Sequence, residues 1–131
     1  MAKRRSLGPK AAQGQARART RQQQFVRLRI DSALRAFRSE AALAAGLGVS
    51  RSQLTRWRAG QQPDPENAAR LAGIDAVVEL LGEFLSETSI PKWLNSPNAH
   101  LANRRPLSLL RAGQLSEVIA AVEAEKSGAF A

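Results

Sequence analysis

The sequence predicts an all-α fold. No segment alternates apolar and polar residues with the period of two that a half-buried strand requires. Several segments instead place apolar residues three and four positions apart, which is the spacing of one helix face. Suitable N-cap residues and helix-ending glycines separate these segments. With 131 residues, 44% of them hydrophobic, the chain can form one compact domain or two small subdomains that share a core.

Residues 1–24 predict a disordered basic arm. They are mainly Gln, Ala, Gly and Arg, without apolar periodicity. Residues 1–30 contain nine Lys or Arg and no acidic residue, whereas residues 61–131 contain six basic and nine acidic residues. The N-terminal end is therefore suited to a polyanion and the C-terminal end is not. The arm itself fits either a solvated tail or a segment that contacts DNA phosphates.

Two helices are predicted directly after the arm. Apolar residues at helical spacing indicate a first helix over residues 25–37. Ser39 is a suitable N-cap for a second helix over residues 40–45, which ends at Gly46 and Gly48.

The segment from Ala44 to Gly60 has the spacing of a helix-turn-helix. The small Ala44 allows the two helices to cross closely, and Gly48 accepts a positive φ at the turn. Ser50 can cap a third helix over residues 51–59. This motif indicates DNA as a partner.

The outer face of the third helix carries the predicted DNA contacts. Leu54 and Trp57 are expected to face the core, and Arg51 and Arg56 to read bases, because a guanidinium pairs bidentately with guanine. A merely solvated face is the alternative. Glu40 argues against tight binding, because many repressors of this type have Gln there and a carboxylate repels phosphate unless it faces away. The predicted DNA-binding residues are Ser50, Arg51, Ser52, Thr55, Arg56 and Arg58, with Ser50 and Thr55, joined by Arg58, as the phosphate contacts.

A long helix is predicted after residue 60. Asp64 is a suitable N-cap and Pro65 suits the first helical position. The apolar stripe continues to about Ser86 and is wide. Such a face needs to be covered on more than one side, either by the core of the same chain or by a second copy.

The remaining sequence predicts short helices. Three pieces begin at Pro91, Pro97 and Pro106, and a last helix covers residues 115–126. The predicted organisation is a basic arm (1–24), a helix-turn-helix domain (25–74) and a second helical domain (75–131).

The composition argues against catalysis and metal binding. The chain has no Cys and one His, which leaves almost no soft metal ligands, so we expect no metal and no cofactor. No nucleophile–base pair, paired carboxylates or phosphate-binding Gly loop is recognisable, and His100 is expected at the surface. We therefore expect that the protein is not an enzyme. No apolar stretch approaches ~18–20 residues and no secretory signal is present, which favours a cytoplasmic protein without membrane contact.

A series of residues in the second half carries a family resemblance. The series is Trp93-Leu94, Ser96-Pro97-Asn98, Leu101, Arg105-Pro106-Leu107, Leu110, Gly113, Val118 and the ending Gly128-Ala129-Phe130. With the helix-turn-helix, it makes residues 25–131 resemble the Xre/MbcA/ParS antitoxins, which join an Xre-like helix-turn-helix to a toxin-binding domain. Residues 1–24 lie outside the resemblance.

The resemblance implies a type II antitoxin. Its partner would be a RES-domain toxin that degrades NAD, and its C-terminal segment would cover the toxin's active site. The pair would repress its own operator, with the antitoxin as a homodimer or in a larger complex with the toxin. A stand-alone helix-turn-helix repressor whose C-terminal half only dimerises is the alternative. The resemblance places toxin-binding candidates in the last helix and tail: Glu123, Lys126, Ser127, Phe130 and Ala131.

Three of the toxin-binding candidates have a second interpretation. Arg104 and Arg105 could contact acidic groups of a toxin or interact with a helix C-terminus. Phe130 follows Gly128 and could anchor a flexible hook in the toxin, or it could fold back onto its own helix.

Overall fold

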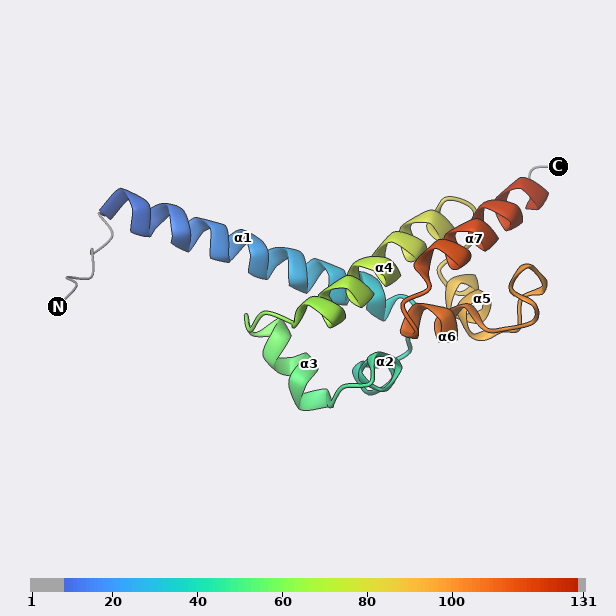
Figure 1. The fold of residues 1–131 in the computed structure, drawn as a ribbon, viewed down its shortest axis with the longest axis horizontal. Coiled ribbons are helices and arrows are strands. Elements are labelled where there is room, and N and C mark those ends of the chain that lie inside the picture. The colour runs from blue at the N-terminus through green and yellow to red at the C-terminus, as the bar shows by residue number, and fades with distance from the viewer. Residues whose placement is uncertain (1–8, 130–131) are drawn as a thin grey trace.

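The computed structural model describes residues 9–129, and this part of the chain is helical without a strand (Figure 1). The all-α prediction is confirmed. None of the described helices is long and apolar enough to cross a membrane. In chain order the elements are α1 (Pro9–Leu34), α2 (Glu40–Leu47), α3 (Arg51–Arg58), α4 (Pro65–Gly82), α5 (Ser89–Asn95), the 3₁₀-helix η1 (Ala99–Leu101), α6 (Pro106–Arg111) and α7 (Leu115–Ala129).

The first helix begins at Pro9 and not at residue 25, so the expectation of a disordered arm is wrong for residues 9–24. Ala, Gln and Arg are good helix formers, and no proline follows Pro9 in this segment. The C-terminal half of α1 is fixed by its buried residues Val26, Ile30 and Ala33. Because nucleation is the costly step, a helix that packing already fixes extends readily into a favourable sequence.

Helix α4 joins the two predicted domains. It packs against α1 on one side and α7 on another, which covers the wide apolar face within the chain (Figure 1). A single hydrophobic cluster extends from α1 to α7. The predicted boundary between residues 74 and 75 therefore falls inside a helix whose buried residues serve both halves: Leu71, Ile74, Val77, Val78 and Leu81.

An ion-pair cluster fixes the chain where α4 ends. The Arg35 guanidinium lies 2.5 Å from a carboxylate oxygen of Glu87 and 3.8 Å from one of Glu79. The hydrogen bond from Arg35 lowers the pKa of Glu87 below its ordinary value. This cluster ties the end of α1 both to α4 and to the turn that follows α4.

Candidate DNA-binding and toxin-binding sites

The helix-turn-helix has the predicted caps and turn. The Ser39 Oγ accepts a hydrogen bond from the Ala42 N–H at 3.1 Å, and the Ser50 Oγ accepts one from the Gln53 N–H at 3.0 Å. Gly48 adopts a left-handed conformation with φ 74° and ends α2. These contacts satisfy backbone donors that the starts of two short helices would otherwise leave exposed.

Helix α3 presents one apolar and one polar face. Leu54 and Trp57 are buried, as predicted. Their burial fixes which side of α3 faces outward. The exposed residues on that side are Arg51, Ser52, Thr55 and Arg56, and their contact with DNA stays a prediction.

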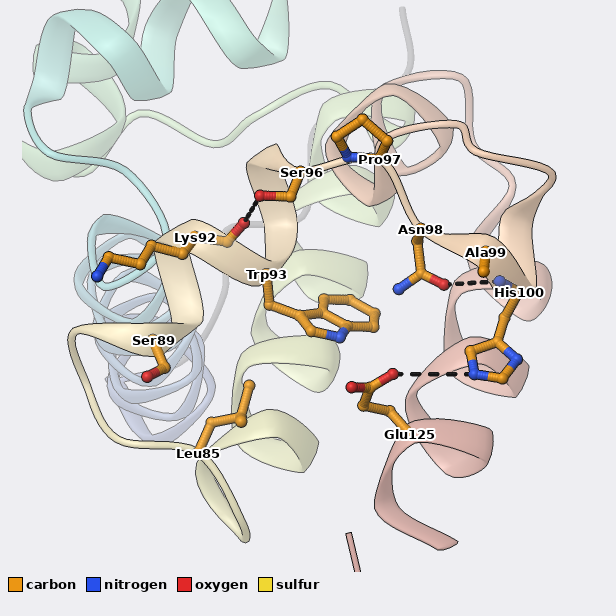
Figure 2. Close-up of a pocket in the computed structure, with 10 residues that line it drawn as sticks. All are labelled: Leu85, Ser89, Lys92, Trp93, Ser96, Pro97, Asn98, Ala99, His100 and Glu125. Carbon is orange, nitrogen blue, oxygen red and sulfur yellow. Dashed lines mark hydrogen bonds and ion pairs between the residues drawn. The ribbon is translucent and has the colours of Figure 1, made fainter. Parts of the chain in front are cut away.

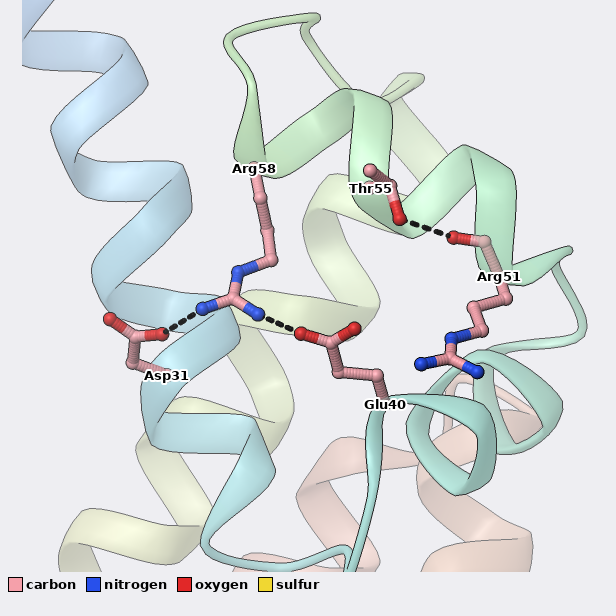
Figure 3. A network of polar contacts seen from close by, with 5 residues as sticks. All are labelled: Asp31, Glu40, Arg51, Thr55 and Arg58. Carbon is pink, nitrogen blue, oxygen red and sulfur yellow. Dashed lines mark hydrogen bonds and ion pairs between the residues drawn. The ribbon is translucent and has the colours of Figure 1, made fainter.

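Two of these exposed side chains have local partners. The Thr55 hydroxyl donates to the Arg51 carbonyl at 3.0 Å (Figure 3), and the Arg56 guanidinium donates to the Gln53 side-chain oxygen at 3.1 Å. Because the Thr55 hydrogen is engaged in this bond, a phosphate oxygen would have to displace the carbonyl to accept it. Among the residues the structure describes, neither arginine is in an ion pair, but the Arg56 guanidinium is hydrogen-bonded to Gln53, so the Arg51 guanidinium is the more available of the two base-reading candidates.

Arg58 occupies the space between two carboxylates (Figure 3). Its guanidinium donates to Glu40 at the start of α2 and lies 3.3 Å from the Asp31 Oδ1 on α1. The arginine therefore links α1, α2 and α3, and it neutralises the carboxylate that argued against DNA binding. A phosphate contact by Arg58 would compete with this arrangement. The spacing of Glu40 and Arg58 in the sequence does not indicate that they pair, and no sequence signal identifies Asp31 as the second partner.

The toxin-binding candidates do not form one cluster. Arg104 donates to the Glu117 carboxylate at 2.9 Å near the start of α7. Lys126 donates to Glu83, and this hydrogen bond raises the pKa of Lys126 above its ordinary value. The two pairs lie nine residues apart along α7, about 14 Å at 1.5 Å per residue.

The other toxin-binding candidates are at the surface or outside the described residues. Arg105 is exposed at the N-cap position of α6. Glu123 and Ser127 are exposed on α7. Phe130 and Ala131 lie outside the residues that the structure describes, so their contribution stays a prediction.

Asn98 organises the loop that carries Arg104 and Arg105. Its side chain is buried and accepts a hydrogen bond from the His100 N–H at 2.9 Å. Its backbone N–H donates to the Arg104 carbonyl at 3.1 Å, and its carbonyl accepts from the Asn103 N–H at 2.8 Å. Asn98 therefore shapes the surface loop and has a structural role.

A shallow pocket of about 400 Å³ lies beside this loop (Figure 2). The Trp93 indole forms one wall, packs against the core, and has its Nε1 buried without a partner among the described residues. The His100 side chain is exposed, as predicted, and its Nε2 is 3.8 Å from the Glu125 carboxylate across the rim. The lining residues are Leu85, Ser89, Lys92, Trp93, Ser96, Pro97, Asn98, Ala99, His100 and Glu125.

The sequence is similar to antitoxins in both halves. Residues 38–75 match a helix-turn-helix family model, and residues 84–128 match the antitoxin Xre/MbcA/ParS C-terminal toxin-binding domain. The mycobacterial cidal antitoxin MbcA of Mycobacterium tuberculosis is 35% identical over 83 residues, which is 63% of this chain and 74% of the relative. A probable mycobacterial cidal antitoxin of the same organism is 32% identical over 92 residues, 70% of this chain and 79% of that protein.

The structural comparison gives the same family. The fold matches a chain in the crystal structure of the M. tuberculosis MbcT–MbcA toxin–antitoxin complex with a TM-score of 0.66 and 29% sequence identity. The match covers 78% of this chain and 94% of the other. The chain therefore belongs to the Xre/MbcA/ParS family of antitoxins.

Proposed function

We propose that this antitoxin neutralises a RES-domain, NAD-degrading toxin in the cytoplasm by covering its active site with the C-terminal segment, and represses its own operator through the helix-turn-helix. The observation that carries the proposal is the structural match to nearly the whole of a chain solved in a toxin–antitoxin complex. The antitoxin itself supplies no catalysis in this proposal; the NAD chemistry belongs to the toxin.

The placement of α7 supports a blocking role for the C-terminal segment. The last turns of α7 project at one end of the molecule (Figure 1). Glu123, Ser127 and Gly128 are exposed there, and the Lys126–Glu83 pair fixes the direction in which the helix leaves the core. A helix held in one direction delivers its tail to a partner at a lower entropic cost than a free peptide does.

The exposed face of α3 supports the operator-binding part of the proposal. Arg51 and Arg56 lie on that face, about 1.4 turns apart, and guanidinium groups at such positions can read guanines in the major groove. A homodimer, alone or bridged by toxin, would place two such helices on a palindromic operator.

Co-expression with the toxic gene next to the antitoxin gene tests the toxin-neutralising part. The full chain should preserve growth and cellular NAD, whereas a chain that lacks residues 128–131 should preserve both poorly. The double variant Arg51→Ala/Arg56→Ala is the control, because it should lose operator binding and still protect. Full protection by the truncated chain would refute the role of the tail.

A second result would overturn the proposal as a whole. If no neighbouring gene is toxic and no protein co-purifies with the antitoxin, the stand-alone repressor is the better description.

A further inference from the structure

The N-terminal half of α1 contributes no buried residue to the core. Residues 9–24 are exposed apart from the half-buried Gln23, and they extend about 24 Å at 1.5 Å per residue (Figure 1). They lie outside both matched segments, which begin at residues 38 and 84. Neither family model therefore includes this segment.

The projecting helix carries unbalanced positive charge. Lys10, Arg17 and Arg21 are seven and four residues apart, so they lie along one stripe of α1, on the side away from the buried Val26 and Ile30. Within the described residues, no basic side chain of α1 is in an ion pair. Arg17 and Arg21 are also one turn apart and repel each other, which opposes helix formation unless anions lie nearby.

Contacts with α3 fix the direction of this helix. The side chain of Gln23 lies against Gly60, where an added Cβ would be 3.0 Å from the Gln23 Nε2. Residues 20–27 of α1 and the end of α3 together line a small pocket at this crossing. The ion pair between Asp31 and Arg58 holds the two helices together further along α1. The basic helix therefore leaves the helix-turn-helix in a defined direction.

We propose that residues 9–24 bind the phosphate backbone of duplex DNA beside the site that α3 reads. Duplex DNA carries one negative charge per ~1.7 Å of its axis, so a basic helix of this length can lie along several phosphates. Such contacts position the protein and strengthen binding without reading sequence. The inference rests on the DNA binding proposed above, and it adds a second, sequence-independent contact.

The test measures affinity against salt concentration for two full-length variants. Arg17→Gln/Arg21→Gln removes two charges from the stripe while keeping a residue type that is already frequent in this helix. Lys92→Gln removes an exposed charge from the C-terminal half, at a residue outside both sets of binding candidates, and is the control. Each protein is titrated against a duplex from upstream of its own gene and against a random duplex of equal length, and circular dichroism checks the helix content.

We expect the stripe variant to bind both duplexes at least about tenfold more weakly than the wild type, by the same factor for each. Its salt slope should fall by about 0.9 for each phosphate that the variant no longer neutralises. Arg17→Lys/Arg21→Lys should keep the wild-type slope, because a phosphate contact needs charge and not the guanidinium shape. Trimming the flanking base pairs should weaken the wild type more than the stripe variant, which keeps only Lys10 of the stripe.

Three results would overturn the inference. They are an unchanged salt slope in the stripe variant, an equal loss of affinity in the control variant, and weaker binding to anionic lipid vesicles with no change in DNA binding. The random duplex keeps the test independent of operator recognition. If the wild type shows no preference for its upstream duplex, operator reading fails while the slopes still decide the role of residues 9–24.

Discussion

The two candidate binding surfaces of this antitoxin use their charges in different ways. On α3, Arg51 and Arg56 are exposed and are in no ion pair with the described residues. On the C-terminal half, Arg104 is paired with Glu117 and Lys126 with Glu83. Apart from Arg58, the first surface keeps its positive charge for a partner, whereas the second, apart from Arg105, has its positive charges paired with carboxylates.

This difference fits the two kinds of partner that we propose. A polyanion attracts unpaired cations over a distance comparable to the Debye length, so unpaired arginines raise both affinity and association rate. A folded protein partner is recognised mainly through a few well-packed residues and complementary shape. Paired charges on that surface hold α7 and the Asn98 loop in position, and they contribute little long-range attraction.

The largest expected effect tests whether both surfaces depend on one core. Trp57 is 1% exposed on the inner face of α3. Trp57→Ala should lower the free energy of unfolding by about 3–5 kcal/mol, measured by urea denaturation. Because one cluster spans α1 to α7, we expect toxin binding to weaken together with DNA binding. Normal toxin binding in this variant would show that the halves fold independently.

The next effect separates the two surfaces. Arg51→Ala and Arg56→Ala should each weaken operator binding by about 1–3 kcal/mol and relax base preference at one position, measured by titration with operator variants. Arg104→Ala is the comparison variant, and it should leave operator affinity unchanged. If all three variants bind the operator as tightly as the wild type does, the assignment of base reading to Arg51 and Arg56 is wrong.

An effect of similar size comes from the close contact between Gly46 and Phe37. A Cβ added at Gly46 would lie 2.6 Å from the Phe37 ring, so Gly46→Ala should destabilise the fold by about 1–3 kcal/mol. A Cβ added at Gly14 would have no neighbouring heavy atom within 4 Å. We therefore expect Gly14→Ala to be neutral or to stabilise α1 by up to about 1 kcal/mol. Thermal unfolding of both variants measures the difference, and equal stability would contradict the packing of Phe37.

The smallest expected effect concerns the ion pair that links the end of α1 to the C-terminal half. Arg35 lowers the pKa of Glu87, so the pair stabilises the fold above the pKa of an unfolded glutamate, about 4.3. This stabilisation is lost as the pH falls through the lower, folded pKa. Glu87→Gln should therefore be slightly less stable than the wild type at pH 7 and equally stable in strong acid. A stability difference that persists in strong acid would contradict a role for the ionised carboxylate.

The helix-turn-helix could be predicted closely because its signals are local. Ser39 and Ser50 cap the helices, Gly48 makes the turn, and Leu54 and Trp57 face inward. Each of these features depends on residues within a few positions of one another, and spacing along the chain is enough to find them.

The features that could not be predicted depend on distant residues or on packing. Arg58 contacts Glu40 and Asp31, which precede it in the sequence by 18 and 27 positions. Residues 9–24 lack an apolar stripe, so their own sequence does not predict a helix. They are helical because they continue the segment of α1 that the core holds in place. The internal pairing of Arg104 and Lys126 also needed the placement of α7 against the rest of the chain.

The buried residues of α4 belong to both halves of the chain, and this limits where segments can be exchanged between two antitoxins. A chimera joined at residue 74 would divide the buried side of one helix between two parents, with Ile74 and Val77 drawn from different cores. A junction in the turn after Gly82 would keep α4 intact. The α7 of one parent would still have to pack against the α4 of the other parent. Swapped specificity in this family should therefore be sought by grafting surface side chains onto one intact core.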